Sequence, residues 1–183
     1  MLILFFGVSG VGKNTLIDEL TSRFGWRYIT TYMTRPLRNK REMGKISISQ
    51  EQFLEMEKQG KFVTVNNLHG NLYGTPIDEV IEAVRNDNSR WVLDFPLSRR
   101  HLFEYYPHIG VVILPESIHQ LIGQIQSSER AERLAEALDD YAQHYSPYQE
   151  QIVDEPRTFV VINFSGKKEE VATLINKLLE GKK

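Results

Sequence analysis

Short runs of apolar residues recur along the chain, separated mostly by stretches with helical spacing or by polar turns. These runs are continuous rather than alternating, a pattern typical of strands buried on both faces. The predicted strands are Leu2–Phe6, Arg27–Thr31, Trp91–Phe95, Gly110–Leu114 and Phe159–Asn163. Strands of this kind that alternate with helices indicate an α/β fold with a mainly parallel five-stranded sheet flanked by helices. A ligand would bind at the carboxyl edge of such a sheet.

Apolar residues three and four positions apart predict the helices between these strands. Start signals support several of them, for example Ser49 with Gln52 three positions later. The predicted helices are Leu16–Phe24, Gln50–Gln59, Ile77–Arg85, Glu116–Gln124, Glu129–Gln151 and Lys167–Leu179. The longest of them contains Pro147, which is a candidate break because proline disrupts helix interiors.

The first predicted strand leads directly into a glycine-rich turn that ends in lysine. Glycines let successive backbone N–H groups turn inward around a polyphosphate, and Lys13 adds a full positive charge. The helix that follows points its positive dipole end at the same anion. This pattern predicts a phosphate-binding loop for a nucleotide. Its residues are Gly7, Ser9, Gly10, Val11, Gly12, Lys13, Asn14 and Thr15.

One position of the loop departs from the usual pattern, in which Ser or Thr directly follows the lysine as a magnesium ligand. Here Asn14 follows the lysine and the hydroxyl comes one position later, at Thr15. This departure weakens the assignment of a metal ligand in the loop, for which Asn14 is the candidate.

Bulk composition narrows the function classes. A chain of 183 residues suits one compact domain, 1–183, and a formal charge of −2 gives no reason to expect binding to nucleic acid or a membrane surface. Cysteine is absent, which excludes disulfides and thiolate metal sites and fits a reducing compartment. The apolar run at the start is too short to span a membrane and lacks a cleavage site. We therefore expect a cytoplasmic protein, either a monomer or a homodimer.

A basic segment, Tyr32–Ser47, stands apart from the rest of the chain. It contains five cations and little apolar content, which is typical of a solvated face but also of an anion-binding loop or lobe. The cations are Arg35, Arg38, Lys40, Arg41 and Lys45.

Four segments together resemble one family, the guanylate kinases. They are Gly7–Thr15 (GVSGVGKNT), Thr34–Arg38 (TRPLR), Phe53 heading a helix, and His69–Thr75 (HGNLYGT). The resemblance implies a P-loop NTPase fold with an inserted nucleoside-monophosphate-binding lobe, about residues 32–76, and a short lid, about residues 123–133. It also implies transfer of a phosphoryl group from ATP to GMP or dGMP, with Mg²⁺ as cofactor.

The resemblance also implies roles for single residues. Arg35, Arg38 and Tyr73 would hold the acceptor phosphate, since guanidinium groups bind phosphate oxygens bidentately. Thr31 and Thr75 stand at positions that contact the base. The remaining roles are metal binding by Asp94 with Asn14, and catalysis by Lys13, Arg133 and Arg130.

Several features depart from the family pattern, and besides Asn14 in the loop, the stretch Gly123–Ser128 lacks the earlier arginines of the lid. The second phosphate-binding tyrosine, expected after Gly44, is missing, and the two carboxylates that read guanine are replaced by Thr64 and Pro96. Two alternatives therefore stay open within the fold: a kinase resembling ribose 1,5-bisphosphate kinases, and a kinase of another nucleoside or deoxynucleoside monophosphate. A third alternative is a non-catalytic guanylate-kinase-like binding module.

Overall fold

The computed structural model describes residues 1–37, 42–68, 70–86, 88–127, 131–150 and 157–182. Its centre is a five-stranded parallel sheet with the strand order β2-β7-β1-β8-β9. The strands are β1 (Leu2–Phe6), β2 (Arg27–Tyr28), β7 (Trp91–Asp94), β8 (His108–Pro115) and β9 (Thr158–Asn163). Every residue of β1 is fully or almost fully buried, as its continuous apolar run predicts.

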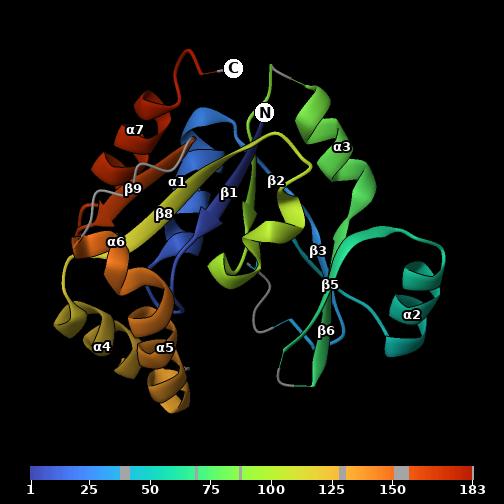
Figure 1. The fold of residues 1–183 in the computed structure, drawn as a ribbon, viewed down its shortest axis with the longest axis horizontal. Helices are drawn as coiled ribbons and strands as arrows, with labels where there is room; N and C mark the ends of the chain where they lie inside the picture. The colour runs from blue at the N-terminus through green and yellow to red at the C-terminus, as the bar shows by residue number, and fades with distance from the viewer. Residues whose placement is uncertain (38–41, 69, 87, 128–130, 151–156, 183) are drawn as a thin grey trace.

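Helices cover the main sheet (Figure 1). Helix α1 packs against α7, and α7 also contacts β9, whereas α3 contacts β1 and α4 contacts β8. The helices are α1 (Lys13–Phe24), α2 (Gln50–Lys58), α3 (Ile77–Arg85), α4 (Ile118–Gln126), α5 (Leu134–Asp140), α6 (Ser146–Glu150) and α7 (Lys168–Leu178). Two 3₁₀ turns, η1 (Leu97–Phe103) and η2 (Ala131–Arg133), and a π-helical turn, η3 (Tyr141–Tyr145), join some of them.

All five predicted strands are present in the main sheet, and the predicted fold class is confirmed. The second strand is shorter than predicted: β2 ends at Tyr28, and Thr31 begins a separate strand. Helix α1 starts at Lys13, three residues earlier than the apolar spacing indicates, because glycine rather than an apolar residue marks its beginning. The predicted helix Glu129–Gln151 consists, over its described part, of η2, α5, η3 and α6, and Pro147 falls in the first turn of α6, where proline is tolerated.

A second, smaller sheet is formed by four strands between residues 31 and 76, a stretch that includes the basic segment. Its strands are β4 (Lys45–Ser47), β3 (Thr31–Met33), β6 (Asn71–Pro76) and β5 (Phe62–Leu68), in that order. Strands β5 and β6 form an antiparallel hairpin, and β3 pairs antiparallel with β6. In Figure 1 this small sheet and α2 lie on the opposite side of the molecule from α4, α5 and α6. The sequence did not predict β4, β5 or β6.

The outer face of the small sheet is apolar and covered by α2. The Phe53 ring of α2 is fully buried and stacks on Phe62 of β5 at a centroid distance of 4.7 Å, and Phe62 in turn contacts Tyr32 of β3. A capping box between Ser49 and Gln52 begins α2, as the sequence predicts. Because α2 packs on one face only, the polar side chains of the sheet gather on the other face.

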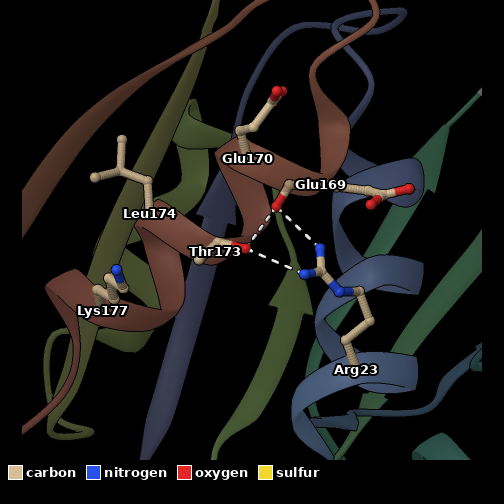
Figure 2. A pocket seen from close by; sticks show the side chains of 6 residues that line it. All are labelled: Arg23, Glu169, Glu170, Thr173, Leu174 and Lys177. Carbon is tan, nitrogen blue, oxygen red and sulfur yellow. Dashed lines mark hydrogen bonds between the residues drawn. The ribbon is translucent and has the colours of Figure 1, made fainter.

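A shallow hollow of about 380 Å³ lies between α1 and α7 (Figure 2). Arg23 reaches from α1 to the Glu169 carbonyl oxygen (3.0 Å) and the Thr173 hydroxyl (3.3 Å) of α7. Lys13 and Arg23 are ten residues apart on α1, so the hollow lies about 15 Å from the start of the helix. This hollow therefore belongs to helix packing and not to the predicted ATP loop. In the described part of the chain, no helix combines the length and apolar character needed to cross a membrane.

Candidate active site

The glycine-rich loop connects β1 to α1 at the carboxyl edge of the main sheet. Gly10 and Gly12 have φ angles of 88° and 92°, in the region that L-residues rarely adopt. A Cβ atom on Gly10 would lie 2.5 Å from the Ile125 side chain, and one on Gly12 would lie 2.6 Å from the Asn163 amide nitrogen. Both glycines are therefore required by backbone conformation and by close packing at once.

Two buried polar side chains from distant parts of the chain hold this loop. The Gly7 N–H donates to the Tyr145 hydroxyl at 3.1 Å, and the Asn163 side-chain amide donates to the Val11 carbonyl oxygen at 2.8 Å. Burial raises the pKa of the Tyr145 phenol, so the hydroxyl stays protonated at physiological pH. These bonds anchor the loop at Gly7 and at Val11.

Lys13 lies over the loop that it follows. Its Nζ donates to the carbonyl oxygens of Gly7 and Val8, the latter at 3.2 Å. It also lies 3.7 Å from the Asp94 Oδ1. The parallel register that pairs Phe5 with Asp94 explains this contact, since it brings the end of β7 beside the end of β1. The structure thus brings together the predicted loop lysine and the predicted metal-binding carboxylate.

The residues present fit Mg²⁺ bound chiefly through nucleotide phosphates. Asp94 supplies one partly exposed carboxylate beside the loop, and Asn14 and Thr15 expose their side chains at the start of α1. The described residues contain no cluster of three or more His, Asp or Glu suited to a metal. One carboxylate with substrate phosphates and water is nonetheless a usual ligand set for Mg²⁺.

The face of the small sheet opposite α2 is polar and mostly buried; we call it the inner face. The side chains that the strand registers place on it include Thr31, Met33, Lys45, Thr64, Asn66, Tyr73 and Thr75. The Thr64 and Thr75 hydroxyls hydrogen-bond each other at 3.3 Å. The predicted acceptor residues Thr31, Tyr73 and Thr75 therefore lie on one surface, and the described residues of that surface include no carboxylate.

Arg35 is held in place beside this inner face. Its Nε donates to the Tyr73 hydroxyl at 3.0 Å, and its two terminal nitrogens donate to the two Glu42 carboxylate oxygens. The Glu42 hydrogen bond is the main reason that the pKa of Arg35 is raised. The guanidinium is thus permanently charged and oriented next to the other predicted phosphate ligand, Tyr73.

Lys45 brings a second cation to the inner face. Its Nζ donates to the Thr31 hydroxyl at 3.2 Å and lies 5.3 Å from the centre of the Tyr28 ring. Burial lowers the pKa of Lys45, although the nearby carboxylates of Asp94 and Glu42 act in the opposite direction. The basic segment is therefore not merely a solvated face, since two of its cations point into structured surroundings.

The remaining predicted residues are less constrained. Arg133 ends η2, and in the described part of the chain its ion pair is with the neighbouring Glu132, at 3.9 Å, rather than with the loop. Arg38 and Arg130 lie outside the described residues. The predictions for these three arginines stay predictions.

Several residues that shape the site had no sequence signal of their own. Tyr145 and Asn163 support the loop, Glu42 orients Arg35, and Asn66 accepts a hydrogen bond from Arg99 of η1. Of these four residues, Asn163 alone could have been found from the sequence, because a polar residue at the end of a buried strand lies at the carboxyl edge of the sheet, where ligands bind.

Comparisons with known proteins agree with this geometry. The guanylate kinase family model matches residues 1–163. A guanylate kinase of Nostoc sp. is 34% identical over 139 residues, which cover 71% of this chain and 69% of that protein. Guanylate kinase 1 of Arabidopsis thaliana is 33% identical over 133 residues, which cover 68% of this chain but only 34% of that longer protein.

A solved structure supports the fold. The crystal structure of guanylate kinase from Anaplasma phagocytophilum matches with a TM-score of 0.67 and 19% sequence identity, and the match covers 98% of this chain and 84% of that one. The chain belongs to the guanylate kinase family.

Proposed function

We propose that this protein transfers the γ-phosphoryl group of ATP to the phosphate of a nucleoside monophosphate, with GMP or dGMP as the leading acceptor. The observation that carries the proposal is the presence of two separate cationic groups. Lys13 lies over the glycine-rich loop, which would bind a polyphosphate, and Arg35 with Tyr73 would form a second phosphate site. Membership of the guanylate kinase family supports the choice of acceptor.

The residues suit phosphoryl transfer because that reaction depends on positioning and charge neutralisation. An oxygen of the acceptor phosphate attacks the γ-phosphorus, the bond to the β–γ bridging oxygen breaks, and ADP and a nucleoside diphosphate form. Lys13 and the loop amides would bind the β- and γ-phosphates. Arg35, Tyr73 and Arg38 would hold the acceptor phosphate, with Thr31 and Thr75 near the base.

Mg²⁺, when bound, would neutralise the charge of the ATP phosphates. Asp94 is the residue best placed to hold it or its water ligands, with Asn14 or the Thr15 hydroxyl contributing from the start of α1. Residues 32–76 would form the acceptor lobe and residues 123–133 a short lid, from which Arg133 and Arg130 would act on the transferring group.

The test is ADP release from Mg²⁺-ATP with GMP, dGMP, AMP, CMP, UMP, dTMP and ribose 1,5-bisphosphate as separate acceptors. We expect the highest kcat/KM with GMP or dGMP. Arg35→Ala should raise KM for the acceptor by about 10- to 100-fold, as loss of a charge-assisted bidentate contact predicts. Arg85→Ala, on the exposed side of α3, is the matched control and should behave as wild type.

Two outcomes would contradict the proposal. Full turnover by Arg35→Ala on the preferred acceptor would remove the phosphate role of Arg35. Turnover of ribose 1,5-bisphosphate with no turnover of any nucleotide would assign the enzyme a sugar phosphate as its acceptor.

A further inference from the structure

Arg99 reaches the inner face of the small sheet from the other side of the site. It belongs to η1, which follows β7 of the main sheet, and its terminal nitrogen Nη1 donates to the Asn66 Oδ1 on β5. Asn66 is 6% exposed and lies directly opposite Tyr73 in the β5–β6 register. Tyr73 in turn accepts a hydrogen bond from Arg35. Arg99 therefore contacts the inner face at the residue paired with Tyr73, next to the predicted phosphate site.

The other face residues near Arg99 are neutral hydrogen-bonding groups. Thr64 lies two residues before Asn66 on β5, so both side chains point the same way, and Thr64 is paired with Thr75. Asn66 is thus the member of the inner face that connects Arg99 to the threonines predicted to contact the base. Arg99 reaches these groups from outside the small sheet, because its backbone lies in η1, directly after β7 of the main sheet.

Arg99 has donors to spare. A guanidinium carries five N–H groups, and among the described residues Arg99 uses its side chain only for the Asn66 bond. Arg35 differs, because Glu42 and Tyr73 already occupy its nitrogens. Arg99 is half-buried, and none of its nitrogens is among the described buried atoms that lack a hydrogen-bond partner, so its unused N–H groups are accessible. A ligand that offers two acceptors in one plane could bind them.

The chemistry of a purine base decides which ligand edge fits. A 6-oxopurine presents O6 and N7 as two adjacent acceptors, which match the planar fork of an arginine, whereas adenine presents an amino donor in place of O6. The donors N1–H and N2–H₂ of guanine are bound most strongly by a carboxylate, and the described residues of the inner face include no carboxylate. Arg99 and the inner face are therefore better suited to binding the acceptor atoms O6 and N7 of a base than its N–H donors.

We propose that Arg99 is a specificity-determining residue that binds the O6 and N7 edge of the acceptor base, and that Asn66 is the residue that positions it. This inference rests on the proposed function and narrows its substrate class to 6-oxopurine nucleoside monophosphates. It implies that IMP is accepted nearly as well as GMP, since the two share O6 and N7 and differ only in the 2-amino group.

The test compares kcat/KM for GMP, IMP, AMP and 7-deaza-GMP in the wild type and in Arg99→Ala. We expect the wild type to use GMP and IMP within about threefold of each other, because nothing on the inner face selects the 2-amino group. Arg99→Ala should lower the GMP-to-AMP ratio of kcat/KM by about 10- to 100-fold, the usual discrimination of one bidentate contact. 7-Deaza-GMP should be a poorer substrate than GMP for the wild type but equal to GMP for Arg99→Ala.

Further variants separate base reading from a structural role. Arg99→Lys keeps the positive charge but loses the fork, so it should also lose discrimination. Asn66→Ala should raise KM for GMP while leaving kcat and the KM for ATP unchanged, and Asn66→Asp, which keeps an acceptor for Arg99, should restore the wild-type KM. Arg85→Ala is the matched arginine control and should keep the wild-type GMP-to-AMP ratio.

The failures of the two proposals can be told apart. If the wild type phosphorylates GMP but Arg99→Ala and Arg99→Lys keep the wild-type ratio, the role of Arg99 is overturned and the proposed function stands. If the wild type discriminates strongly against IMP, the base is read through its 2-amino group and the inference is wrong. If the wild type turns over no nucleoside monophosphate, the proposed function itself fails.

Discussion

The phosphate loop and the inner face of the small sheet are both polar surfaces, but they are built in opposite ways. The loop presents backbone N–H groups, and its shape depends on glycines that have no room for a side chain. The inner face presents side chains, and its shape depends on strand register. Backbone N–H groups can bind phosphate, but substitutions change them little. A surface made of side chains can acquire a different ligand through substitutions that leave the fold unchanged.

Charge separates the two regions further. Around the loop, one lysine faces one carboxylate, Asp94, at 3.7 Å. At the small sheet, Arg35 is neutralised by Glu42, while Lys45 and Arg99 bond to neutral groups. The loop thus contains a closely balanced pair of charges, whereas the small sheet carries cations that donate to neutral polar groups. Four predictions test this contrast.

The largest effect is expected at the loop cation. Lys13→Ala should lower kcat by about 10²- to 10³-fold, the usual effect of removing one charged donor from a transition state. The unfolding free energy should change little, because Lys13 bonds only to two carbonyl oxygens and a carboxylate. Steady-state kinetics and urea unfolding measure the two effects. Lys58→Ala, an exposed lysine of α2, should change neither, and an active Lys13→Ala enzyme would refute the role of the loop.

The next effect should appear when a side chain is added to the loop. Gly12→Ala should destabilise the fold by about 3 kcal/mol, the upper end of the cost of a strained backbone site, because the new Cβ also meets the Asn163 amide nitrogen. ATP affinity should fall with it. Denaturant unfolding and nucleotide titration are the measurements.

Gly25 offers a matched control for this change. It has a φ of 68°, but a Cβ there would meet nothing within 4 Å, so Gly25→Ala measures backbone strain alone. We expect Gly12→Ala to cost more than Gly25→Ala. Asn163→Ala in the Gly12→Ala background should recover part of the difference, and the lack of any recovery would show that crowding against Asn163 is not the cause.

A smaller effect should follow from the bond beneath the loop. Tyr145→Phe leaves the buried Gly7 N–H without its acceptor, which should cost about 1–2 kcal/mol of stability. KM for ATP should rise as well, since the first turn of the loop loses its support. The control is Tyr105→Phe, because Tyr105 is 86% exposed and should contribute nothing. Equal stability of the two variants would show that the Tyr145 bond does not hold the loop.

The smallest effect concerns Lys45 and depends on pH. Because burial lowers its pKa, the unfolded chain binds a proton that the folded protein has released, between the lowered value and about 10.4. Stability should therefore rise with pH through that window. Lys45→Met should be more stable than wild type near pH 7, and this advantage should shrink toward pH 10. Urea unfolding at several pH values measures this stability difference. A difference that grows with pH would contradict the prediction. The control, Lys58→Met, should differ from wild type by the same amount at every pH.

Much of this arrangement could be predicted from the chain. The five strands of the main sheet, the start of α2 at Ser49 and the glycine-rich loop were all recognisable, because each depends on residues close together in sequence. The pairing of Arg35 with Tyr73 followed from family resemblance, and the structure brings them within 3.0 Å. The strands of the small sheet escaped prediction because they mix polar and apolar residues and contain or adjoin glycines, so none of them has the continuous apolar run that marks the strands of the main sheet.

What the sequence determined by itself is the loop, the alternation of strands and helices, and the types of residue available for each site. What only the tertiary structure decided is which side chains meet: Tyr145 with Gly7, Asn163 with Val11, and Arg99 with Asn66, each pair at least 33 residues apart. The physical reason is the distance along the sequence over which each interaction acts. Backbone conformation and burial periodicity are set by near neighbours, whereas contacts between distant residues follow from strand register and helix packing, which no local stretch of sequence contains.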